Sequence, residues 1–65
     1  MQLTIETERE DDGRWIAEIP QLPGVMSYGA TLDEALRACR ALALEVLAAR
    51  LREGESIDSV HFIAA

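Results

Sequence analysis

Hydrophobic and polar positions alternate at the start of the chain, which is typical of a β-strand with one buried face. Over residues 2–8, Leu3, Ile5 and Thr7 share one face and the polar side chains share the other. Residues 10–13 then form a polar turn that ends in glycine. The pattern predicts a strand followed by a tight reversal of the chain.

Alternation resumes over residues 14–20, which predicts a second strand paired antiparallel to the first. One face carries Trp15, which we expect to pack in the core, and the other carries Ile16 and Glu18. Pro20 cannot donate a hydrogen bond to a neighbouring strand, so the strand must stop there.

A rigid corner follows, because Pro23-Gly24 is a strong turn dipeptide. Residues 25–28 then read as a short third strand, and Gly29 releases the chain into a helix. Thr31 is a suitable N-cap, and Glu34 three residues later completes a capping box.

The helix is expected to run from residue 32 to about residue 52, with Gly54 as its stop. Its apolar positions recur at helical spacing and predict one buried stripe. The stripe consists of Leu32, Ala35, Leu36, Cys39, Leu42, Ala43, Val46 and Leu47. Residues 57–64 are apolar on both sides and read as a last strand.

The element order is therefore β-β-β-α-β, an α+β fold. A right-handed crossover after the third strand places the last strand parallel to the first. The expected sheet is four-stranded and mixed, in the order 3-2-1-4, with one helix on one face.

A single helix cannot cover both faces of such a sheet, and the last strand forms a long apolar edge. These features predict a homodimer or a higher homo-oligomer, to which Leu44 and Leu51 on the flank of the helix could also contribute. The residues expected at this interface are Ile16, Ile57, His61 and Ile63.

The length and the charge narrow the possible functions. Sixty-five residues form a single domain over 1–65 with a small core of its own. The net charge of −6 disfavours direct binding to nucleic acid; it suits either solubility alone or attraction of a basic protein partner. Cys39 is the only cysteine, so an internal disulfide is impossible and neither a zinc site nor any cofactor is indicated.

The densest group of charges is acidic and lies around the first turn. It consists of Glu6, Glu8, Glu10, Asp11 and Asp12. One interpretation is a surface for a basic partner, and the other is a solvated hairpin tip. No nucleophile accompanies His61 in sequence, and no arrangement of carboxylates suggests acid–base chemistry, so an enzyme is not expected.

Three segments taken together resemble the HicB-like antitoxin family over about residues 1–53. The matching segments are Gly13-Arg14-Trp15-Ile16-Ala17, Ile19-Pro20-Gln21-Leu22-Pro23-Gly24 and Gly29-Ala30-Thr31-Leu32-Asp33-Glu34-Ala35-Leu36. Trp15, Pro20, Pro23, Gly24, Gly29, Thr31 and Glu34 are the structural positions of this pattern. The resemblance implies a partial ribonuclease H-like sheet that carries one main helix.

The resemblance also implies a function. Full-length HicB-like proteins bind and neutralise HicA, a small basic toxin that cleaves messenger RNA, and commonly carry a C-terminal DNA-binding segment. No such segment follows residue 65 here, so we expect a stand-alone neutralising domain that does not bind operator DNA by itself. The alternative is a homo-oligomeric scaffold or small-ligand binder without a toxin. With neither a secretory leader nor an apolar span in the sequence, the expected location is cytoplasmic.

Overall fold

The computed structural model describes all residues from 1 to 65 and contains four strands and one helix. The strands are β1 (Gln2–Arg9), β2 (Trp15–Glu18), β3 (Met26–Gly29) and β4 (His61–Ala64), and the helix is α1 (Leu32–Arg52). The sheet order is β3-β2-β1-β4, with β4 parallel to β1 and the other pairs antiparallel. The predicted topology is confirmed.

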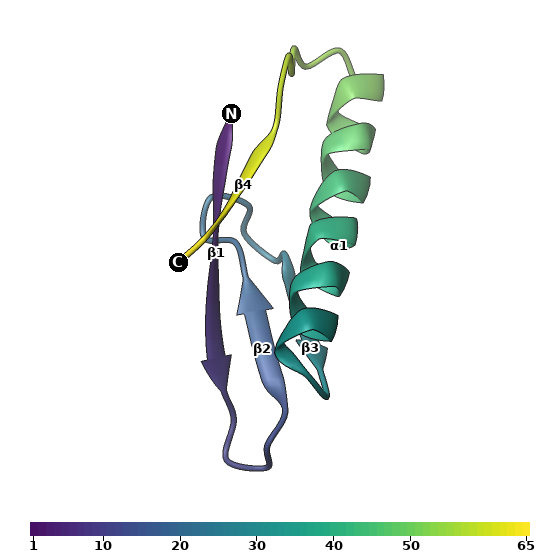
Figure 1. Cartoon of the computed structure of the whole chain (residues 1–65). Helices are drawn as coiled ribbons and strands as arrows, with labels where there is room; N and C mark the ends of the chain where they lie inside the picture. Colours follow the sequence, from purple (N-terminus) through teal and green to yellow (C-terminus); the bar gives the residue numbers. More distant parts are fainter.

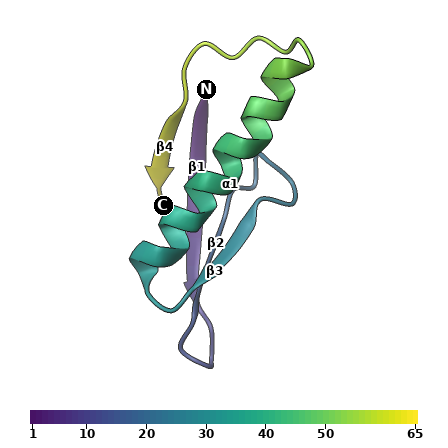
Figure 2. The ribbon, with the colours of Figure 1, turned by 90° about the vertical axis from the view of Figure 1, so that its right-hand side faces the viewer.

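The helix lies along one face of the sheet, as Figures 1 and 2 show. It packs mainly on β3 and β2, contacts β1 less and hardly contacts β4. The opposite face of the sheet has no element over it. The structure therefore has two layers, and one face of the sheet is open.

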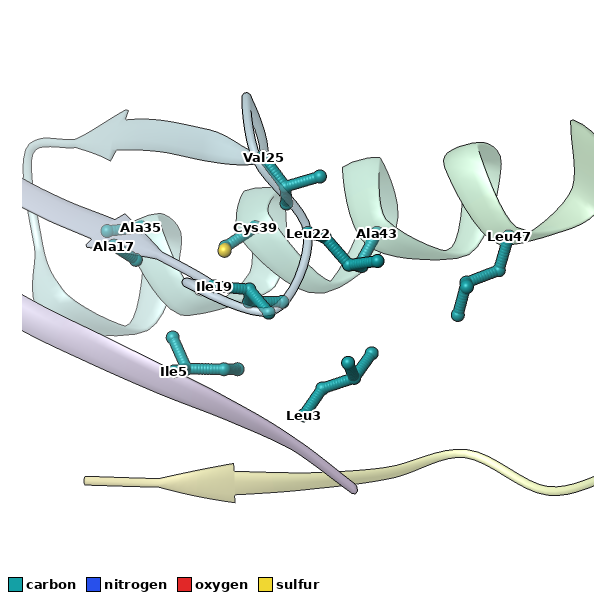
Figure 3. Packing of buried hydrophobic residues seen from close by; sticks show 10 residues of the cluster. All are labelled: Leu3, Ile5, Ala17, Ile19, Leu22, Val25, Ala35, Cys39, Ala43 and Leu47. Atoms are coloured by element: carbon teal, nitrogen blue, oxygen red, sulfur yellow. The ribbon is translucent and has the colours of Figure 1, made fainter. Parts of the chain in front are cut away.

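Ten buried residues form a core between the sheet and α1 (Figure 3). They are Leu3, Ile5, Ala17, Ile19, Leu22, Val25, Ala35, Cys39, Ala43 and Leu47. Trp15 is half-buried against this cluster, as its position in the alternating pattern predicts. By contrast, Leu32 at the start of the predicted stripe is 38% exposed.

The proline–glycine corner adds three of these core residues. Ile19 and Val25 are joined by a backbone hydrogen bond of 3.1 Å, and Leu22 between them is buried. Gly24 has a φ of 91°, which a residue with a side chain rarely adopts. The corner is thus a compact loop that contributes to the core as well as ending β2.

Gln21, in the same loop, forms side-chain hydrogen bonds to β1 beyond the point where β2 ends. Its side-chain oxygen accepts a hydrogen bond from the backbone N–H of Thr4 at 3.3 Å, and its amide nitrogen lies 3.3 Å from the Thr4 hydroxyl. The observed strand β2 is therefore shorter than the strand predicted over residues 14–20. Pro20 cannot pair, and the N–H of Arg14 donates to the Asp12 carboxylate at 3.0 Å instead of to a strand.

The helix begins at the predicted N-cap. Thr31 accepts a hydrogen bond from the backbone N–H of Glu34 at 3.1 Å, and the Glu34 carboxylate accepts one from the N–H of Ala30 at 3.0 Å. The capping interaction of Glu34 therefore reaches one residue further back than in the usual capping box. At the other end, Gly54 has a φ of 101° and its N–H donates to the carbonyl of Leu51 at 3.1 Å, which ends the helix as predicted.

The last strand begins at His61, four residues later than predicted. The N–H of His61 donates to the carbonyl of Met1 at 2.9 Å, and the Met1 amino group donates to the carbonyl of Ser59 at 2.7 Å, so contact with this end of β1 reaches back only to Ser59. Ile57 and Val60 instead pack against the core from the connection between α1 and β4. The prediction of strand structure at residues 57–60 is wrong for this reason.

Candidate partner-binding face

The pairing of the strands shows which residues lie on the open face of the sheet, since paired residues point to the same side. One row across the sheet contains Glu6, Glu18 and Met26, and the next contains Glu8, Ile16 and Tyr28. On the other side of β1, Gln2 pairs with His61 and Thr4 with Ile63.

Carboxylates gather at the centre of this face. Glu6 on β1 lies directly opposite Glu18 on β2, and Glu8 is the next residue along on the same side of β1. Together with Glu10 they surround a hollow of about 290 Å³, in which Ile16 is the only apolar lining residue. We call Glu6, Glu8, Glu10 and Glu18 the acidic hollow.

None of these four glutamates has a basic partner within the chain. The two ion pairs in the structure lie elsewhere, between Arg14 and Asp12 at 2.7 Å and between Arg37 and Asp33 at 2.9 Å. Like charges placed directly across a strand pair destabilise a sheet. The acidic hollow therefore keeps an electrostatic cost that a bound cation or basic side chain would relieve.

The two aspartates that the sequence grouped with these glutamates do not join them. Both lie in the turn between β1 and β2, outside the strands, and Asp11 is exposed there. Asp12 binds the Arg14 side chain, and hydrogen bonds from the backbone and side chain of Arg14 lower the pKa of the Asp12 carboxyl. Arg14 also lies 4.6 Å from the centre of the Tyr28 ring. Asp12 thus holds Arg14 at the hairpin tip and does not line the acidic hollow.

Glu18 is the member of the hollow that the sequence prediction left out. Alternation along residues 14–20 already placed it on the same face as Ile16, but only the hairpin register brings it opposite Glu6. The sequence alone does not give the register of β2 against β1, and a shift of that register by one residue would turn Glu18 toward the helix.

Three of the four residues predicted at a homodimer interface lie on the open face. Ile16 is half-buried at the acidic hollow, while His61 and Ile63 on β4 are exposed. Ile57 does not lie there, because it precedes β4 and packs against the core.

The structure contains no arrangement suited to nucleophilic catalysis. Cys39 is fully buried, and burial raises the pKa of its thiol, whereas His61 is exposed on β4. A buried thiol and an exposed imidazole cannot act as a nucleophile and its base.

No group of three or more His, Cys, Asp or Glu side chains is arranged to hold a metal ion. The structure also contains no helix whose length and apolar character would let it cross a membrane.

Comparison with known proteins finds a similar sequence and a similar solved structure. The chain is 39% identical over 56 residues to the UPF0150 protein ssr1258 of Synechocystis sp., covering 86% of this chain and 75% of that protein. Its fold matches the crystal structure of the N-terminal domain of Burkholderia pseudomallei antitoxin HicB with a TM-score of 0.75 and 25% identity. That match covers 85% of this chain but only 65% of the solved chain. No family model matches the sequence.

The fold is thus that of a small α+β domain of the HicB N-terminal kind. The chain belongs to the UPF0150 family, which is HicB-like, and the family expected from the sequence is confirmed.

Proposed function

We propose that this chain is the neutralising domain of a toxin–antitoxin pair, which binds a small basic HicA-like toxin that cleaves messenger RNA. The family and the fold support an antitoxin role, since the solved neighbour is the N-terminal domain of an antitoxin. The observation that carries the proposal is the acidic hollow, in which Glu6 and Glu18 face each other and neither forms an ion pair with a basic side chain of the chain.

The proposed mechanism is occlusion. A protein that cleaves RNA must attract phosphates with arginine and lysine side chains, and the carboxylates of the acidic hollow can take the place of those phosphates. Ile16 offers an apolar floor for the aliphatic stem of such a side chain, while the glutamates bind its charged end. The chain itself performs no chemical step in this proposal, and it acts in the cytoplasm, where the toxin would meet its substrate.

We also propose that the chain self-associates as a homodimer. The uncovered edge at β4 leaves an apolar side chain exposed, that of Ile63 at 43%. A domain with ten buried residues gains stability from burying such surface against a second copy.

The first test is purification of the tagged chain from its own host at low salt, with mass spectrometry of what accompanies it. A stoichiometric small basic protein encoded beside the chain, released by added salt, supports the proposal. Recovery of the chain alone at native expression levels contradicts it and favours the homo-oligomeric scaffold.

The second test uses two variants of equal net charge with the recovered toxin. In one, Glu6, Glu8, Glu10 and Glu18 are changed to Gln; in the control, Glu45, Glu53, Glu55 and Asp58, all exposed and away from the hollow, are changed to their amides. Calorimetry should show the hollow variant binding at least about tenfold more weakly, with a shallower salt dependence, because contacts between charge pairs are lost. If both variants lose the same affinity, overall charge and not the hollow attracts the toxin.

A further inference from the structure

The outer edge of β4 has backbone groups with no partner. In the parallel pairing with β1, the N–H of His61 donates to Met1 at 2.9 Å and the N–H of Ala65 donates to Ile5 at 3.0 Å. Alternate residues of a strand point their backbone groups to opposite sides. The N–H and C=O groups of Phe62 and Ala64 therefore point away from the sheet, and β4 is its last strand.

Nothing in the chain protects this edge. The strand His-Phe-Ile-Ala carries no lysine, carboxylate or proline and no bulge, which are the usual means of blocking strand addition. The helix hardly contacts β4, and Figure 2 shows the strand at the side of the sheet. Next to the unpaired backbone lies Ile63, which is 43% exposed on the open face.

We propose that two copies of the chain join through antiparallel pairing of β4 with β4 of the second copy, with the two-fold axis at Ile63. This inference rests on the proposed self-association and adds the element and the register. The product is one continuous eight-stranded sheet.

The register follows from the free backbone groups. Antiparallel residues that form a hydrogen-bonded pair exchange both N–H···O bonds. If Phe62 pairs with Ala64 of the second copy, symmetry pairs Ala64 with Phe62 of that copy, so both outward-facing residues of each strand are satisfied. An axis at Phe62 or Ala64 would instead pair one of them with a residue outside β4. Ile63 then lies directly opposite Ile63 of the second copy, and both isoleucines are covered.

The charges fit a second copy at this edge. The net charge of −6 on each chain opposes association, but β4 contains no acidic residue and the acidic hollow lies over β1 and β2. A two-fold axis perpendicular to a continuous sheet leaves both open faces on the same side. The dimer would present two acidic hollows on one face and both helices on the other.

Cysteine cross-linking tests the register. The Cα atoms of a non-hydrogen-bonded antiparallel pair lie about 4.5 Å apart, which is within the range of a disulfide. Mild oxidation of Ile63→Cys should therefore give a covalent dimer, while the buried Cys39 stays unreactive. The control is Met26→Cys, on the opposite edge strand and 46% exposed, which should give no covalent dimer under the same conditions.

Sedimentation equilibrium tests the role of the backbone. Ala64→Pro removes an N–H that only the second copy would use, so we expect the dissociation constant to rise at least about tenfold. The control Ala64→Val keeps that N–H and should change it less than about threefold, because the side chain of Ala64 is exposed. Circular dichroism checks that both variants are folded.

The outcomes distinguish the proposed self-association from the proposed β4 register. A monomer at all concentrations refutes the self-association and this inference together. A dimer in which Ile63→Cys fails to cross-link, or in which Ala64→Pro binds as tightly as Ala64→Val, refutes the β4 register and leaves the self-association standing. Neither result depends on a toxin, so the antitoxin proposal is tested separately.

Discussion

Glu6 and Glu18 lie directly opposite each other on neighbouring strands of the open face, and neither forms an ion pair with an arginine. A free domain would be more stable without this arrangement, because like charges across a strand pair repel. This pair without an ion-pair partner is the observation on which the proposed binding of a basic toxin rests.

The first prediction concerns the cost of this pair. Glu18→Lys should increase the free energy of unfolding by about 0.5 kcal/mol at low salt, since it replaces a repulsive cross-strand pair by an attractive one. Urea denaturation measures the change, and Glu45→Lys on the exposed side of α1 is the control for net charge. The same Glu18→Lys variant should lose toxin affinity. Equal stabilisation by both variants would show that overall charge, and not the pair, is responsible.

The second prediction concerns the close approach of β3 to the helix. A Cβ atom added at Gly29 would lie 2.4 Å from the backbone nitrogen of Ala35, which cannot move without disturbing the first turn of α1. Gly29→Ala should cost about 3 kcal/mol, the upper end of the range for overpacking. The comparison is Gly24→Ala, where φ is 91° but nothing lies within 4 Å, and which should cost about 1 kcal/mol. A reversed order in thermal or urea denaturation would contradict the packing of Gly29.

The third prediction concerns the reactivity of Cys39. Burial holds the pKa of its thiol above the ordinary value, so at pH 8 the folded chain should react with a thiol reagent roughly 100-fold more slowly than the urea-unfolded chain. The stability gained from keeping the thiol neutral is present below the pKa of the unfolded thiol, about 8.5, and is lost as the pH rises through the higher folded pKa. Rapid labelling of the native chain would show that α1 opens easily from the sheet.

The fourth prediction concerns the hairpin tip. The hydrogen bonds from Arg14 lower the pKa of Asp12, so its carboxyl should titrate below the ordinary value of 3.8 in an NMR experiment. The contribution of this group to stability is present above the pKa of the unfolded carboxyl and is lost as the pH falls through the lower folded pKa. Arg14→Ala should raise the pKa part of the way, because the backbone hydrogen bond stays, and should shift the Tyr28 ring resonances. No change in either would contradict the contacts of Arg14.

Local interactions explain why the fold could be predicted so closely. Thr31 and Glu34 fix the start of the helix by hydrogen bonds within a few residues, and Gly54 ends it by its own backbone conformation. The proline at position 20 stops β2 whatever surrounds it. The last strand was predicted too long because its extent depends on pairing with β1, a contact such as that of His61 with Met1 between residues far apart in sequence.

The site was predicted less completely for the same physical reason. Membership of the acidic hollow is decided by which residues the strands bring opposite each other, and so Glu18 was missed. Asp12 was included because its charge is visible in the sequence, while its hydrogen bonds to Arg14 appear only once the turn has formed.

The amino-acid sequence by itself determined the strands, the helix, their order and the face that each buries, because periodicity, capping and proline act over short distances along the chain. Only the tertiary structure decided the register of β1 against β2, the first residue of β4, and the unpaired backbone of Phe62 and Ala64. Those features depend on contacts between residues distant in sequence, and both the acidic hollow and the free edge follow from them.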